Sequence, residues 1–180
     1  MGVALYTALL LVVREHVIFM PSITVLGTAG MKLMNFLPLI VCLAVLLCLE
    51  RRLGPAELTG VRRVVAADRA LVLVTGGAVL LVGLAAHGWL NMPTATAAGR
   101  NVLFLTGLAL LVRSRFGAAV AASVAVGWLF LTAAAGLRTP QDPYPWAVLL
   151  EPPGHLLAAV ATIGMTLLGV LALGHEPPRR

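Results

Sequence analysis

The chain alternates between long apolar runs and short polar breaks. Six runs of about 12 to 22 residues carry few or no charges, and arginine, glutamate and proline dominate the segments between them. Because a helix needs about 20 mainly apolar residues to cross a bilayer, this pattern predicts six helical spans. Their expected bounds are roughly 2–13, 33–49, 70–91, 98–112, 117–137 and 155–173.

The first run is short and ends at Arg14, Glu15 and His16. We expect the helix either to stop there or to continue into the apolar segment 17–22. A secretory signal peptide is not expected, since no basic residues precede the run and no small-residue cleavage site follows it.

The basic residues divide unequally between the two sets of loops that six spans create. One set and the C-terminal tail hold nine of them: Arg51, Arg52, Arg62, Arg63, Arg69, Arg113, Arg115, Arg179 and Arg180. The other set holds four: Arg14, Lys32, Arg100 and Arg138. Cytoplasmic loops carry the excess of Arg and Lys, so both termini are predicted to be cytoplasmic.

Composition agrees with a chain whose surface faces lipid. Hydrophobic residues make up 60% of it and charged residues 11%, whereas a soluble domain is about one quarter charged. We therefore predict an all-α, polytopic membrane protein with one transmembrane domain over residues 1–180. The net charge of +6 is explained by topology, and nucleic acid is not an expected partner. All basic residues except Lys32 are arginine, which is typical of a GC-rich bacterial genome and favours a bacterial plasma membrane.

Catalytic motifs are missing from the sequence. It contains no GxxxxGK[ST], HExxH, CxxC or GxSxG pattern, so we expect neither an enzyme nor a bound cofactor in this chain. The four histidines lack the i, i+4 spacing of a ligand face, and no metal site is expected. Uncharged polar residues do occur within the predicted spans, chiefly Asn35, Thr75, Thr106, Thr132, Thr162 and Thr166.

Two of the loops have sequence patterns that predict local structure. In 50–69, Pro55 and Glu57 suit the first turn of a helix, and Leu58, Val61 and Val65 would share one face of it. This predicts a short amphipathic helix, which either lies on lipid headgroups or docks on a cytoplasmic protein. The loop 138–154 holds five prolines around the apolar WAVLL segment, which predicts a rigid short helix or re-entrant turn.

The chain resembles the permease subunits of type-2 ABC exporters, especially small actinobacterial ones. The resemblance rests on AGRNVLFLTGLALLVRSRFG at 98–117, on the LPLI…E…VRRV…D progression from Leu37 to Asp68, and on the Pro- and Trp-rich segment 139–153. It implies a six-helix subunit that pairs with a second permease subunit and docks on separate ATP-binding cassette proteins, which hold the ATP and magnesium.

The resemblance also implies roles for the two loops. The coupling helix, which docks on the ATPase, would lie at about 55–67 and use Glu57, Leu58, Val61, Arg62 and Val65. The outside re-entrant segment would run through Pro145, Trp146 and Glu151.

Two other functions remain open. The substrate-binding membrane subunit of an energy-coupling vitamin importer has a similar size and six spans. That class should show an Ala-xxx-Ala docking face in its first span, for which this chain offers Ala4 and Ala8, and a ligand pocket under the outside loops. The other alternative is a membrane scaffold or immunity protein that uses its helices only for association.

Overall fold

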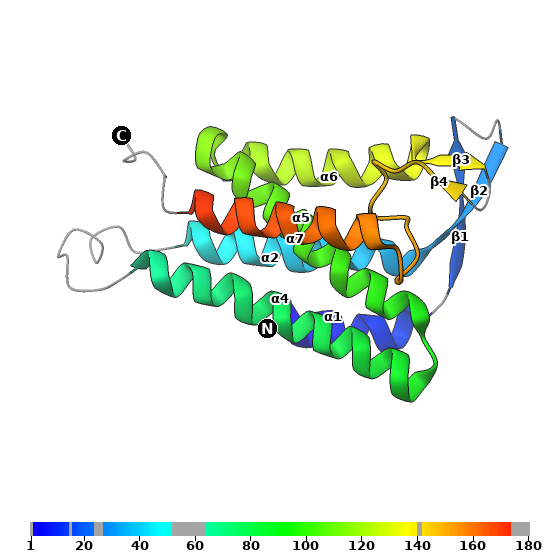
Figure 1. Ribbon diagram of the computed structural model, residues 1–180, viewed down its shortest axis with the longest axis horizontal. Helices are drawn as coiled ribbons and strands as arrows, with labels where there is room; N and C mark the ends of the chain where they lie inside the picture. Colours follow the sequence, from blue (N-terminus) through cyan, green and yellow to red (C-terminus); the bar gives the residue numbers. More distant parts are fainter. Residues whose placement is uncertain (1, 15, 24–26, 52–63, 140–141, 174–180) are drawn as a thin grey trace.

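The computed structural model describes residues 2–14, 16–23, 27–51, 64–139 and 142–173, and these residues are mostly helical (Figure 1). Each predicted apolar run contains a helix, so the mainly helical prediction is confirmed. The helices are α1 (Gly2–Val13), α2 (Leu37–Glu50), α4 (Val64–Leu90), α5 (Pro93–Phe116), α6 (Ala118–Ala135) and α7 (Leu156–Ala172), and a 3₁₀ helix, η1 (Leu33–Phe36), leads into α2.

Four of the helical segments are long and apolar enough to cross a membrane: Leu33–Glu50, Val65–Leu90, Pro93–Phe116 and Ala118–Ala135. These segments are typical of a membrane protein. The helices α1 and α7 are equally apolar but shorter. At 1.5 Å per residue they measure about 18 Å and about 26 Å, against a hydrocarbon core of about 30 Å.

Successive helices run in opposite directions. The end of α1, the α4–α5 junction, the end of α6 and the start of α7 all lie at one end of the bundle (Figure 1). Asn91, with a φ of 52°, turns the chain between α4 and α5 at this end, and asparagine adopts that conformation readily. At the opposite end, Gly117 links α5 to α6 with a φ of 85°, which favours glycine.

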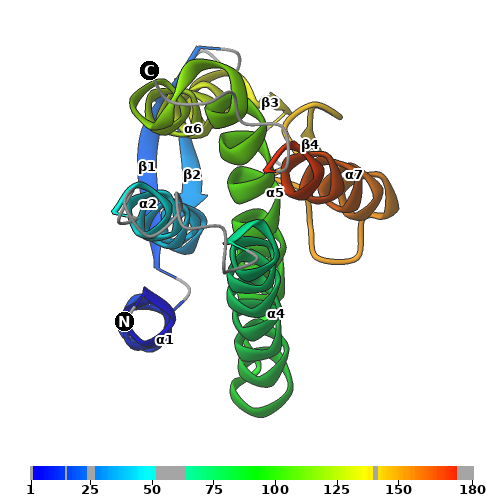
Figure 2. The ribbon, with the colours of Figure 1, turned by 90° about the vertical axis from the view of Figure 1, so that its left-hand side faces the viewer.

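Helix α5 is the central element, packed against α7, α4, α6 and α2 (Figure 2). Its small residues explain this position, because they let neighbouring backbones approach closely. A Cβ on Gly107 would lie 2.5 Å from the carbonyl oxygen of Met165 in α7. A Cβ on Gly169 would in turn lie 2.5 Å from the Gly107 carbonyl oxygen, so the α5–α7 contact depends on both glycines.

Two β-hairpins were not predicted and modify the all-α assignment. Strands β1 (Val17–Ser22) and β2 (Gly27–Lys32) pair antiparallel, and β3 (Leu137–Thr139) pairs with β4 (Asp142–Pro143). Both lie at the same end of the bundle, which we call the hairpin end (Figure 1). Helix α1 therefore does not continue into 17–22: Arg14, with a φ of 44°, terminates it and the chain enters β1.

Two helix starts differ from the prediction. Helix α4 begins at Val64, within the expected loop 50–69, because Val64–Ala67 has no helix breaker and continues directly into the apolar run. Helix α5 begins at Pro93 rather than at 98, since proline suits the first helical turn and the following Thr and Ala residues sustain it.

Candidate functional site

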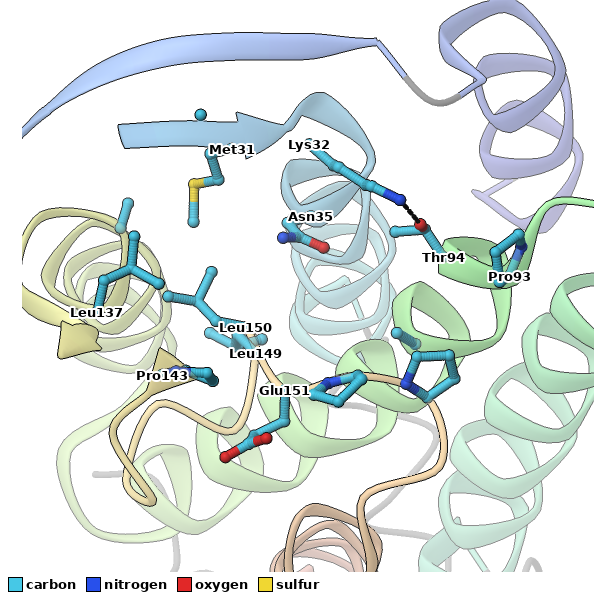
Figure 3. Close-up of a pocket in the computed structure, with 15 residues that line it drawn as sticks. Met31, Lys32, Asn35, Pro93, Thr94, Leu137, Pro143, Leu149, Leu150 and Glu151 are labelled. Atoms are coloured by element: carbon cyan, nitrogen blue, oxygen red, sulfur yellow. Dashed lines mark hydrogen bonds between the residues drawn. The ribbon is translucent and has the colours of Figure 1, made fainter. Parts of the chain in front are cut away.

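A cavity of about 350 Å³ opens at the hairpin end, where four parts of the chain converge (Figure 3). Strand β2 and η1 contribute one wall, the first turns of α5 the second, the end of α6 with β3 and β4 the third, and the segment 149–153 the fourth. Its volume lies at the lower end of the range for small-molecule pockets, about 300–1,000 Å³. The lining residues are Gly30, Met31, Lys32, Asn35, Pro93, Thr94, Ala97, Ala133, Leu137, Pro143, Leu149, Leu150, Glu151, Pro152 and Pro153.

The wall formed by 149–153 is held in place by Arg100 of α5, whose residue is only 7% exposed. The Arg100 guanidinium donates hydrogen bonds to the carbonyl oxygens of Val148 at 2.9 Å, Glu151 at 2.8 Å and Pro152 at 3.0 Å. A guanidinium presents five N–H donors in a planar fork, so one side chain can fix several carbonyls. Arg100 therefore anchors the segment that closes the cavity.

Asn101 adds a second anchor beside Arg100. Its side-chain amide is fully buried and donates to the Leu149 carbonyl oxygen at 2.8 Å. The segment needs such donors because proline has no N–H and a proline-rich stretch cannot satisfy its own carbonyls within a regular helix. Arg100 and Asn101 supply that missing hydrogen bonding from the neighbouring helix.

The segment expected to be re-entrant, from Pro145 to Glu151, folds as consecutive turns and not as a short helix. The Ala147 amide donates to the Tyr144 carbonyl oxygen at 2.8 Å, and the Leu150 amide donates to that of Ala147 at 2.9 Å. Pro145 is exposed, whereas Glu151 is buried and lines the cavity. Of the two structures proposed from the sequence, a helix or a turn, the turn is therefore the one observed.

Aromatic side chains hold the outer surface of this segment. Trp146 is 38% exposed, and its ring lies 6.3 Å from that of Tyr144 in a stacked arrangement. On the other side it meets Trp128 of α6 edge to face at 6.2 Å. Such pairs add about 0.5–1.5 kcal/mol each beyond the area they bury, so Trp146 anchors the segment to α6.

The Glu151 carboxylate lies away from the centre of the cavity. One carboxylate oxygen is 3.5 Å from Nδ1 of His155, four residues further along the chain. Arg100 also attracts this carboxylate electrostatically. Among the described residues of the cavity wall, the single acidic side chain thus has a histidine and an arginine as neighbours.

The residues expected to form a coupling helix cannot be placed against this site. Glu57, Leu58, Val61 and Arg62 lie outside the described residues. Val65 lies in the first turn of α4 and is 40% exposed. It belongs to the end of the bundle opposite the cavity (Figure 1).

Several threonines within the helices donate their hydroxyls to backbone carbonyls. Thr132 donates to the Trp128 carbonyl, and Thr162 to the Ala158 carbonyl at 2.7 Å. Thr166 donates to the carbonyls of Thr162 at 2.8 Å and of Leu103 in α5 at 3.2 Å. These bonds stabilise the helices and their packing.

Sequence reasoning missed most of this site. Lys32 and Arg100 were interpreted as loop charges that set topology, and Asn35 only as a polar residue within a span. The signal for Arg100 was the adjacent Arg-Asn pair near a helix start combined with a proline-rich segment that needs donors. Nothing in the sequence indicated which carbonyls Arg100 and Asn101 would meet, 48 to 52 positions further along the chain.

Among the described residues, no group of three or more His, Cys, Asp or Glu side chains could hold a metal ion. Comparison of the chain with protein-family models, with curated proteins and with solved structures finds no match.

Proposed function

We propose that this chain is the membrane-embedded, substrate-binding subunit of an ATP-driven transporter in a bacterial plasma membrane. The six helices α1, α2, α4, α5, α6 and α7 cross the bilayer, both termini are cytoplasmic and the hairpin end faces outward. The alternating directions of the helices and the nine-to-four division of basic residues support this topology. The short α1 crosses where the bilayer thins locally.

The observation that carries the proposal is the cavity at the hairpin end. It is lined by strands, by helix ends and by the turns at 149–153, has mixed polar and apolar walls and is large enough for a small organic molecule. A scaffold that uses its helices only for association has no need of such a pocket. ATP hydrolysis is assigned to a separate ATP-binding cassette protein, because the sequence lacks a phosphate-binding loop.

Two features favour the energy-coupling importer class over the exporter class. A pocket beneath outward-facing loops is what that class needs to collect its substrate. Ala4 and Ala8, spaced four residues apart on α1, are both exposed and form a smooth face on which a coupling protein can dock.

The permease subunit of a type-2 ABC exporter is the second candidate. The Pro145–Glu151 turns precede the last helix at the hairpin end, where exporter permeases carry their re-entrant helices. In this form the chain pairs with a second permease subunit, and Glu57, Leu58, Val61, Arg62 and Val65 dock on the ATPase.

The two docking modes are separated by paired variants of the tagged full chain, purified from native membranes, with ATP hydrolysis of the complex as the readout. We expect Ala4→Leu with Ala8→Leu to remove the ATPase activity, and Leu58→Glu with Val61→Glu to retain it. Ala70→Leu, an exposed alanine on α4, is the matched control and should have no effect.

The exporter function predicts the opposite outcome for the two double variants. If no ATPase activity co-purifies with the unmodified chain, an ATP-driven function is wrong in either form. Because the test measures docking of the ATPase and not ligand binding, its result does not depend on what occupies the cavity.

A further inference from the structure

The cavity at the hairpin end is mainly apolar. Among the described residues that line it, ten of fifteen are methionine, leucine, alanine or proline. Met31, Ala97, Ala133 and Leu149 are buried, so they form its inner walls. Pockets for small molecules are typically lined in this way, by apolar side chains with a few polar groups among them. The apolar surface of a bound molecule would therefore leave water on entering the cavity.

Four of the apolar lining residues are prolines from three separate segments. Pro93 begins α5, Pro143 belongs to β4, and Pro152 and Pro153 lie in the segment before α7. A proline ring has no rotamer freedom to lose, so packing a molecule against it costs no side-chain entropy. Arg100 also fixes the Pro152 carbonyl by a hydrogen bond. Much of the apolar wall is thus formed before a ligand arrives, and such preorganisation favours affinity.

The charged side chains of the described lining are engaged within the protein. Lys32 donates a hydrogen bond to Thr94 Oγ1 (Figure 3) and has a further interaction besides. The Glu151 carboxylate lies beside His155 Nδ1 and is attracted by Arg100. No described lining residue has a fully buried side-chain nitrogen or oxygen without a hydrogen-bond partner. The polar part of the lining therefore requires no charged group on a ligand.

An ionised molecule would gain little in such a cavity. A charge that leaves water needs a partner inside the protein, because burying it unpaired is costly. Since Lys32 and Glu151 already have partners, a charged ligand would have to break existing contacts. A neutral molecule loses mainly the hydration of its apolar surface, and that loss is favourable.

We propose that the cavity binds a small, neutral, mainly apolar organic molecule, and this assignment of the substrate class rests on the proposed transport function. The molecule packs against Met31, Leu137 and Leu149, which lie together in Figure 3. The volume of about 350 Å³ is near the lower limit for ligand pockets, which favours a molecule the size of one substituted aromatic ring.

The test measures calorimetric binding to the purified full chain in lipid nanodiscs, without any ATPase. Three ring compounds of nearly equal size are compared: at neutral pH benzyl alcohol is neutral, benzoate is an anion and benzylamine is a cation. Heats measured with empty nanodiscs are subtracted, because benzyl alcohol also partitions into lipid. We expect benzyl alcohol to bind at least about tenfold more tightly than either ion, a difference of about 1.4 kcal/mol. Glycerol, which is neutral but polar, should not bind at millimolar concentration.

Filling the cavity should remove binding without removing the fold. Ala97→Leu adds apolar volume from α5 and Ala133→Leu adds it from α6, and each should weaken benzyl alcohol at least about tenfold. Ala70→Leu, at an exposed alanine of α4, is the matched control and should leave the affinity unchanged. The free energy of unfolding of each variant shows whether it folds.

A thiol in the cavity wall gives a second measurement with a smaller change in volume. With Cys42 and Cys48 replaced by alanine, Ala97→Cys places a single thiol there. Benzyl alcohol should slow its reaction with a small methanethiosulfonate at least about tenfold, and benzoate and benzylamine should not. Arg138→Cys is the control, because neighbouring strand residues point to opposite faces and Leu137 lines the cavity. Its reaction rate should be the same with every compound.

The proposal is overturned if benzyl alcohol shows no binding beyond its partitioning into empty nanodiscs, or if either ion binds as tightly. It is also overturned if folded Ala97→Leu and Ala133→Leu bind benzyl alcohol like the unmodified chain, or if all three compounds protect Ala97→Cys equally. Failure of ATPase docking with intact benzyl alcohol binding would reject the transport function alone, and the reverse result would reject the substrate class alone.

Discussion

Replacing Arg100 by methionine should release the proline-rich segment that closes the cavity. Methionine keeps most of the length and volume of the arginine stem but removes all five donors. The carbonyls of Val148 and Glu151 then lose their hydrogen bonds within a buried environment, and the carbonyl of the exposed Pro152 loses a part-buried one. Asn101 still holds the Leu149 carbonyl, so the segment is weakened at one edge and not detached.

The size of the effect follows from two opposing contributions. Each charge-assisted hydrogen bond contributes about 1.5–3 kcal/mol. The variant also removes the cost of keeping a cation out of water, which is several kcal/mol. Loss of one member of a buried charged network typically costs about 3–5 kcal/mol, and we expect about 3 kcal/mol because methionine fills most of the space.

Two assays measure this loss. The free energy of unfolding in mixed micelles, followed by tryptophan fluorescence, should fall by about 3 kcal/mol. Hydrogen exchange should locate the change: the Ala147 and Leu150 amides, bonded in the turns, should exchange about a hundredfold faster. Arg100→Lys should lie between methionine and arginine, because one ammonium group cannot reach all three carbonyls.

Arg115→Met is the matched control, since Arg115 lies on the same helix and is exposed. The anchoring role of Arg100 is refuted if Arg100→Met is no less stable than Arg115→Met. It is also refuted if stability falls uniformly while exchange at Ala147 and Leu150 stays that of the unmodified chain.

Three further outcomes are expected. Gly107→Ala should lower the free energy of unfolding by about 1–3 kcal/mol, because the new Cβ meets the Met165 carbonyl at the α5–α7 contact. Gly77→Ala, with open space around it, should be neutral or slightly stabilising in the same unfolding assay. Asn101→Leu should lower stability by about 1–3 kcal/mol and accelerate exchange in the same segment as Arg100→Met. The chain freed of partners should show no ATP hydrolysis in a phosphate-release assay, and turnover that survives removal of contaminants would contradict the assignment of hydrolysis to a partner.

The helices could be predicted because the information for them is local. A run such as 33–49 is apolar throughout, so hydropathy alone identifies it, and α2 with η1 occupies it with one residue of difference at the end. Helix starts were less predictable. Pro93 and Val64 begin α5 and α4 earlier than the apolar runs do, because helix formation tolerates the Thr, Ala, Asp and Arg residues that hydropathy counts as loop.

The hairpins could not be predicted from local pattern. Segment 17–22 is apolar enough to continue a helix, and β2 contains two glycines that weaken any strand assignment. What decides between helix and strand is the pairing of β1 with β2 and the contact of β1 with α6. Directly after β1, the Ile23 amide donates to the Ala134 carbonyl oxygen of α6 at 3.0 Å. That contact spans more than a hundred residues of sequence.

The candidate site, like the hairpins, depends on contacts between segments that are far apart in the sequence. Charges near span ends usually report topology, and Arg100 was interpreted in that way. In the fold its guanidinium is buried because the turns before α7 bring three carbonyls to it. The sequence shows that Arg100 has five N–H donors. Which carbonyls accept from them depends on how distant segments pack together.

The proposed function requires the cavity at the hairpin end to face the outside of the cell, where a transporter collects its substrate. The most direct measurement is labelling with a membrane-impermeant maleimide in intact cells, in a chain lacking Cys42 and Cys48. Asp142→Cys, in β4 at the hairpin end, should react in intact cells, and Arg115→Cys, at the opposite end, should react only after permeabilisation. Reaction of Arg115→Cys in intact cells, with Asp142→Cys protected until permeabilisation, would contradict the proposed orientation.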